Sequence, residues 1–133
     1  MNMGHAVLTL SAIDAVMHED GKERKLPFRV KLHLSRTKEV LQKEVKIYEE
    51  ERVRLVNEFG DESELPDGSK GIEVKDPVKL ENFYKALEDV LKTEITADYY
   101  KISQDDLKLI EDMEIEISEP QIRAFFEYAV EKE

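Results

Sequence analysis

Apolar residues recur every seven positions along the middle of the chain. The series consists of Leu34, Leu41, Tyr48 and Leu55. Seven-residue spacing sustained over this length is typical of a helix that packs along another helix, as in a coiled coil. Residues 28–59 contain no proline or glycine, whereas Pro27 suits the first position of a helix and Gly60 suits its end. We therefore predict one continuous helix over residues 27–59.

The length of this helix predicts an elongated molecule. At about 1.5 Å per residue the helix would extend over roughly 50 Å. A compact domain of this chain length has a diameter of roughly 35–40 Å. We therefore expect the helix to project from the rest of the protein as an arm.

A turn and a second helix should follow. Asp67 and Gly68 form a pair that favours tight hairpin turns, so residues 60–75 predict a small β-hairpin or an ordered loop. Asp76 suits an N-cap and Pro77 a first helical position, which predicts a helix that returns along the first one. At about 16 residues this helix would cover only roughly 24 Å. The rest of the long helix must then be covered by the N-terminal segment, the C-terminal segment or another chain.

The N-terminal segment, residues 1–26, predicts two short elements. Apolar residues at positions 7–10 suggest a short strand. Ser11 suggests the N-cap of a short helix that ends near His18, because a serine hydroxyl can accept hydrogen bonds from the first free amides of a helix.

The C-terminal segment, residues 94–133, predicts a strand and two short helices. Residues 94–102 are rich in β-branched and aromatic side chains, which favour a strand. Ser103 then suits the start of a short helix. The alternation at residues 114–117 suggests a second brief strand, and Ser118 begins a capping box that opens the last helix.

These elements together predict a single domain over residues 1–133. Its fold class is mainly α with a minor β component. The central feature is a long antiparallel helical hairpin over residues 27–93, which carries the small β-hairpin and is accompanied by short capped C-terminal helices.

Charge is distributed unevenly along this chain of net charge −11. Residues 1–60 carry a net charge of +1 and residues 61–133 a net charge of −12. A basic protein partner for the acidic half would explain this asymmetry, and so would head-to-tail association of chains, pairing within the chain or ordinary solvated helix faces. Nucleic acid is disfavoured, because the acidic half would repel phosphates. One group of basic residues could meet a polyanion or pair with the acidic half: Lys22, Arg24, Lys25, Arg29, Lys31, Arg36 and Lys38.

Residue types that carry enzyme chemistry are scarce. The chain has no cysteine, and its three histidines, His5, His18 and His33, lack metal-ligand spacing. No glycine-rich phosphate loop or nucleophile elbow occurs. The acidic pair Asp105 and Asp106 suits the first turn of a helix and lacks the remaining pattern of a calcium loop. We therefore predict a protein that is not an enzyme and needs no metal or cofactor.

The chain also lacks an apolar run of the roughly 18–20 residues that a membrane helix requires, and its N-terminus does not resemble a signal peptide. These features predict a soluble intracellular protein with no membrane contact. Two sets of residues are candidates for a protein interface, which a second copy of the chain or a different protein would cover. They are the apolar series Leu34, Leu41, Tyr48 and Leu55 and the acidic residues Asp105, Asp112, Glu114 and Glu116.

The order of motifs resembles an uncharacterised family of small helical-hairpin proteins that tailed bacteriophages and prophages encode. The resemblance covers roughly residues 8–130. The motifs that carry it are Leu26-Pro27, Tyr48 to Arg52, Asp67-Gly68, Lys75 to Pro77, Leu91 to Ile95 and Lys101 to Leu107. It implies a phage or prophage origin and a location in the host bacterial cytoplasm or on the virion.

Two functions fit these expectations. The first is a phage interaction protein that serves as a virion accessory, an assembly factor or a scaffold, and the exposed part of the long helix motivates it. The second is an inhibitor or adaptor that binds a host or competitor protein through its acidic C-terminal half.

Overall fold

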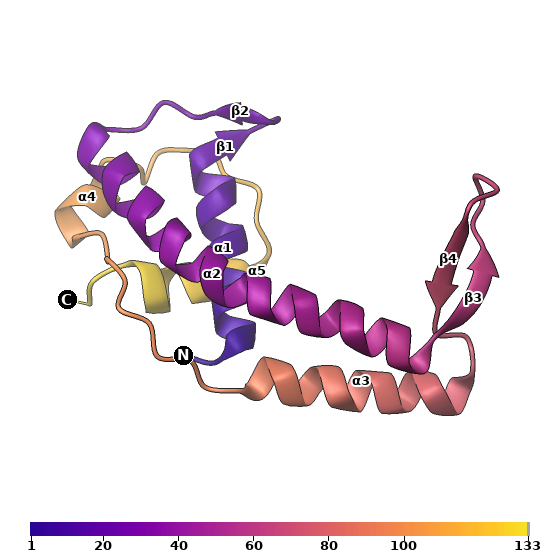
Figure 1. Ribbon diagram of the computed structural model, residues 1–133. Coiled ribbons are helices and arrows are strands. Elements are labelled where there is room, and N and C mark those ends of the chain that lie inside the picture. Colours follow the sequence, from indigo (N-terminus) through magenta and orange to yellow (C-terminus); the bar gives the residue numbers. More distant parts are fainter. Residues whose placement is uncertain (133) are drawn as a thin grey trace.

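The computed structural model describes residues 1–132 and shows a helical body from which a two-helix arm projects (Figure 1). Two small two-stranded sheets accompany the helices. The predicted fold class, mainly α with a minor β component, is confirmed.

The arm is built from the two helices that the sequence predicted. Helix α2 comprises Phe28–Phe59, and helix α3, Pro77–Lys92, runs back along its second half. The carboxylate of Asp76 accepts hydrogen bonds from the backbone N–H groups of Val78 and Lys79 at 2.8 and 3.2 Å. These bonds satisfy amides that have no partner within the helix and fix the start of α3.

A β-hairpin occupies the tip of the arm, as the sequence predicted. Strand β3, Asp61–Glu64, pairs antiparallel with strand β4, Lys70–Glu73. Gly68 adopts a φ of 84° in the turn, a conformation that costs glycine little. At the base of the hairpin a side chain on Gly60 would collide with Ile72, so the absence of a Cβ lets the hairpin fold closely onto the end of α2.

The N-terminal segment differs from the prediction. It forms one helix, α1, over Met3–Met17, and the strand predicted at residues 7–10 is wrong. Asn2 caps this helix and forms a capping box with His5, so the cap lies nine residues before the predicted cap at Ser11. A short hairpin follows, in which β1, His18–Glu19, pairs with β2, Lys22–Glu23.

The C-terminal segment contains the two predicted helical elements and neither predicted strand. Helix α4 comprises Gln104–Lys108, helix α5 comprises Glu119–Ala124, and α5 continues into a π-helix, η1, over Phe125–Ala129. Residues 94–102 form only isolated bridges, Asn2 to Glu94 and Ile102 to Val130. Their neighbours belong to helix ends, so no ladder can extend along them.

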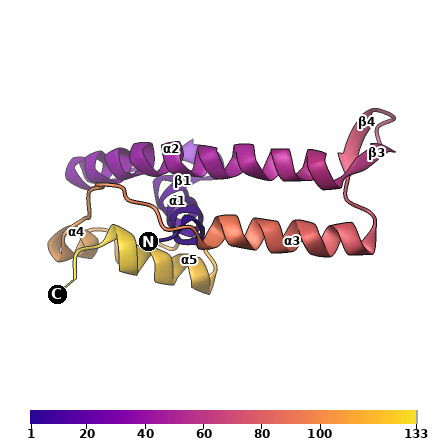
Figure 2. The same ribbon diagram turned by 60° about the horizontal axis from the view of Figure 1, so that its bottom comes forward.

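Helix α1 lies at the centre of the body, where it crosses α2 and contacts α3, α5 and η1 (Figure 2). The chain's own N-terminal segment therefore covers the half of α2 that α3 does not reach. Polar contacts hold the same layers together. The guanidinium of Arg29 lies 2.6 Å from the buried carboxylate of Asp106, and the Lys38 ammonium lies 2.7 Å from Asp14.

Candidate functional site

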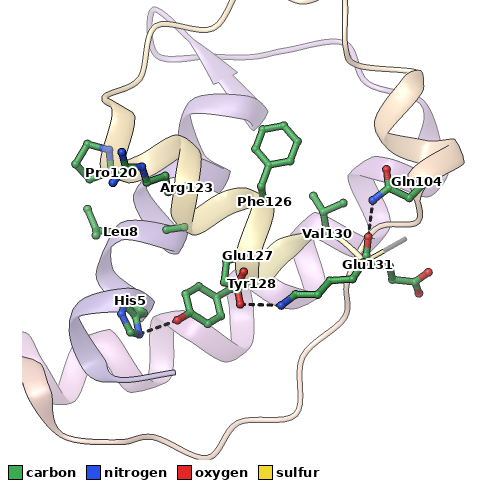
Figure 3. Close-up of a pocket in the computed structure, with 12 residues that line it drawn as sticks. His5, Leu8, Gln104, Pro120, Arg123, Phe126, Glu127, Tyr128, Val130 and Glu131 are labelled. Atoms are coloured by element: carbon green, nitrogen blue, oxygen red, sulfur yellow. Dashed lines mark hydrogen bonds and ion pairs between the residues drawn. The ribbon is translucent and has the colours of Figure 1, made fainter.

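A hollow of about 850 Å³ opens between α1 and the C-terminal end of the chain (Figure 3). His5 and Leu8 of α1 line one side, and η1 lines the other with Phe126 and Tyr128. Gln104 closes one end, where its side-chain amide donates to the Glu131 carbonyl at 2.6 Å. A π-helix is rare and often occurs at a functional site.

One imidazole nitrogen that borders the hollow takes part in two hydrogen bonds. Nδ1 of His5 accepts from the backbone N–H of Asn2 at 3.1 Å and lies 3.0 Å from the hydroxyl of Tyr128. Since the amide can only donate, Nδ1 must be the acceptor and the Tyr128 hydroxyl must donate to it. The two rings also stack, with centroids 5.0 Å apart. The contact joins the start of α1 to the π-helix.

Two ionisable side chains that line the hollow have shifted pKa values. Burial, together with the nearby carboxylates of Glu127 and Glu94, raises the pKa of Tyr128, so its hydroxyl stays protonated at neutral pH. A hydrogen bond from the Lys132 ammonium, at 2.9 Å, lowers the pKa of Glu127, so that carboxylate stays ionised. Neither group is tuned toward neutral pH, where a general acid or base works best.

The predicted apolar interface requires a correction. Leu34, Leu41, Tyr48 and Leu55 are 1%, 0%, 9% and 3% exposed, because α1 and α3 cover them within the chain. They are core residues and present no surface to a partner. Their seven-residue spacing correctly predicted a helix packed along other helices, and the helix that completes the packing is α1.

The predicted acidic residues are placed differently. Asp105, Asp112, Glu114 and Glu116 are all exposed. The last three belong to the acidic segment, which we define as residues 111–119 and which contains five carboxylates and no Lys or Arg. From residue 112 to residue 117 exposed and half-buried side chains alternate. This period of two is that of an extended chain, although the brief strand predicted at residues 114–117 does not form.

Most carboxylates of the acidic segment have no cation beside them. Among residues 1–132, ion pairs form to Glu119 and to none of Glu111, Asp112, Glu114 and Glu116. A polar hollow of about 400 Å³ separates Glu114 and Glu116 from Glu19 and Asp20 of the first hairpin. Four carboxylates and the guanidinium of Arg24, which pairs with Glu19, therefore border this hollow.

Most of the basic residues near the start of α2 form ion pairs with carboxylates of the same chain. Arg24 pairs with Glu19, Lys31 with Glu23, and Arg29 with Asp106. Only the last of these pairs joins the basic region to the acidic half of the sequence. Lys38 pairs with Asp14, and Arg36 lies over the ring of Tyr100, 5.2 Å from its centroid.

The three histidines lie apart in the fold. His18 contacts the Asp14 carbonyl at 3.3 Å, and the ring of His33 stacks on Tyr100 with centroids 6.1 Å apart. Within residues 1–132, no group of three or more His, Asp or Glu side chains is arranged to hold a metal ion. Within the same residues, no helix has both the length and the apolar character needed to cross a bilayer.

No protein-family model, curated protein or solved structure matched this chain. The candidate sites therefore rest on the geometry described above.

Sequence reasoning missed the hollow between α1 and η1. No sequence motif connects His5 to Tyr128, which lies 123 positions away. One signal was available. Residues 1–13 contain no charged side chain in a chain of which 38% is charged, which indicates a segment buried on several sides.

Proposed function

We propose that this protein acts by binding another protein that presents a basic surface, and that it catalyses no reaction. The observation that carries the proposal is the acidic segment. Glu111, Asp112, Glu114 and Glu116 are exposed, and none of them forms an ion pair among residues 1–132. Complementary charge across an interface speeds association and selects the partner.

The resemblance to phage-encoded proteins supports a setting for this activity. In an infected bacterium, a protein of this kind would act as an inhibitor or adaptor that binds a host or competitor protein. The scaffold function was motivated by an exposed apolar series on α2, and that series is buried inside the fold. This burial favours the inhibitor or adaptor function over the scaffold function. The acidic half remains available to a partner.

The proposal is tested by removing the charge without changing the fold. We expect the variant Asp105→Asn/Asp112→Asn/Glu114→Gln/Glu116→Gln to lose a partner that the wild-type protein retains from host lysate. Binding by the wild-type protein should weaken steeply as salt rises, because exposed charges are screened. Retention is measured by immobilising each protein and quantifying bound proteins by mass spectrometry.

A matched control separates local charge from net charge. The variant Glu50→Gln/Glu62→Gln/Glu64→Gln/Asp89→Asn also removes four exposed carboxylates, and these lie on the arm. It should retain the same partner as the wild-type protein. Equal retention by all three proteins would contradict the proposal, and equal loss in both variants would show only a general effect of net charge.

The arm supports a second candidate function, self-assembly. Helix α3 buries only Phe83 among its sixteen residues, and it leaves Val78 and Tyr84 67% and 59% exposed. An arm two helices thick with exposed apolar side chains can pack against a second copy. This arrangement would suit a virion accessory, an assembly factor or a scaffold.

Light scattering coupled to size-exclusion chromatography tests this candidate. If the arm associates, the wild-type protein should form a dimer or a larger species, and Val78→Lys/Tyr84→Lys should be monomeric. Leu109→Lys is the control, because Leu109 is 54% exposed and lies in the body. A monomeric wild-type protein at high concentration would exclude self-assembly through the arm.

A further inference from the structure

An apolar recess lies directly beneath the acidic segment. It has a volume of about 240 Å³, and nine of its ten lining residues are apolar. Met113, Ile115 and Ile117 of the acidic segment line it, together with Ile122 and Phe126. The only charged residue that lines it is Glu111, and no Lys or Arg does so.

The recess is open to solvent at an apolar rim. Ile122 and Phe126 are 40% and 52% exposed. Covering these two side chains would be favourable, because it would remove apolar surface from water. Glu111 lines the recess itself, and the exposed carboxylates of Asp112, Glu114 and Glu116 alternate with its apolar lining residues along the same segment. An apolar depression therefore adjoins a segment of chain that carries five carboxylates and no Lys or Arg.

From this arrangement we infer that the recess is the anchor site for one large apolar side chain of a basic partner segment. The inference rests on the proposed function and specifies the chemistry of the partner. An aromatic or branched aliphatic side chain would enter the recess, and flanking Lys or Arg residues would meet the carboxylates outside it. A central apolar anchor inside a polar rim is the usual arrangement of residues that dominate binding energy.

The size and lining of the recess select this occupant. An apolar cavity of about 150 Å³ accommodates benzene, so the recess has room for one aromatic or branched side chain and too little for a folded element. A polar ligand would lose hydrogen bonds to water without replacement. An anionic segment would be repelled by Glu111 in the lining and by the other carboxylates of the acidic segment.

A pair of short peptides provides the probe. The first has one tryptophan between two pairs of lysines, with both ends blocked, and the second has alanine in place of tryptophan. The protein contains no tryptophan, so the emission of the peptide is observed without background. We expect the emission to shift to shorter wavelength on binding. Calorimetry at low salt should show the tryptophan peptide binding about tenfold more tightly than the alanine peptide.

Two variants assign the effect to the recess. Ile122→Lys places a cation at the rim and should abolish both the emission shift and the tenfold preference. Ile47→Lys is its control, because Ile47 is exposed on the arm and the substitution adds the same charge. Glu114→Gln/Glu116→Gln should weaken both peptides by the same factor. Circular dichroism and the melting temperature show that each variant is folded.

The outcomes distinguish this inference from the proposed function. If both peptides bind equally and the Glu114→Gln/Glu116→Gln variant weakens both, the acidic surface is confirmed and the anchor site is excluded. A tryptophan preference that survives Ile122→Lys would also exclude this recess. If neither peptide binds at low salt, both the inference and the proposed function fail.

Discussion

At the scale of single residues, His5 joins parts of the chain that are far apart in sequence. Its backbone and ring complete the capping box of α1, and the same ring nitrogen accepts from Tyr128 on the π-helix. The hydroxyl of Tyr128 is thus a link between the start of α1 and the end of the chain. Burial raises the pKa of this hydroxyl, so the link persists over the neutral range.

This link can be tested with Tyr128→Phe. We expect a loss of about 1 kcal/mol in the free energy of unfolding at pH 7, the typical worth of one hydrogen bond. The raised pKa means that the contribution is fully present below the ordinary tyrosine pKa of about 10 and is lost as the pH rises through the raised value. Urea unfolding at neutral and alkaline pH should therefore show the difference between wild type and variant shrinking at high pH.

The control for this prediction is Tyr84→Phe. Tyr84 is 59% exposed and its hydroxyl makes no hydrogen bond among residues 1–132, so its removal should leave the free energy of unfolding unchanged at both pH values. A loss at Tyr128 that stayed constant into the alkaline range would contradict the role assigned to its hydroxyl.

At the scale of elements, the arm depends on a single cap. Asp76 alone accepts from the first amides of α3, and α3 buries little apolar surface. We expect Asp76→Ala to destabilise the protein by about 1 kcal/mol. Hydrogen exchange should report where the loss occurs, with faster exchange along α3 and unchanged exchange along α1. Asp76→Ser should restore most of the protection, because serine is also a good N-cap.

The elements that sequence predicted well are those with clear local boundaries. Pro27 and Gly60 bracket α2, and Asp76 with Pro77 marks the start of α3. The start of α1 was missed because its capping box uses Asn2 with a histidine at the third position, where a glutamate or glutamine is usual. Ser11, an attractive cap in isolation, lies within the helix instead.

The strand predicted at residues 94–102 failed for a different reason. Strand propensity records how well a side chain fits a partly buried sheet, and a strand also needs a neighbour with which to pair. Here the neighbours are Met1 and the backbone after η1, which offer isolated hydrogen bonds and no ladder. Local composition cannot reveal that such a neighbour is absent.

The candidate sites show the same difference between features that follow from local sequence patterns and features that depend on contacts made only in the folded chain. The alternation at residues 114–117 is a local pattern, and the structure retains it as alternating exposed and half-buried side chains although no strand forms. The recess beneath them depends on Val16 from α1, Ile110 from near α4 and Phe126 from η1, which only the packed fold brings together. The apolar series on α2 was misjudged for this reason too, because coverage of a helix depends on every other element.

At the scale of the whole molecule, the arm makes the protein longer than a compact domain. We expect small-angle X-ray scattering to give a radius of gyration above about 14 Å, the value for a compact chain of this length. The pair-distance distribution should have an extended tail beyond the dimensions of the body. A value near 14 Å would mean that the arm folds back in solution, which would contradict the straight course of α2.

The uninterrupted course of α2 through body and arm has a mechanical consequence. No proline or glycine divides the helix where it leaves the body, so the β-hairpin stands at a fixed distance and direction from the acidic segment. Seven added residues would lengthen this spacing by about 10 Å and turn the hairpin only slightly, whereas four would lengthen it by about 6 Å and rotate it by about 40°. Two partners bound at the two ends would be held at a separation that is set by the number of helical turns between them.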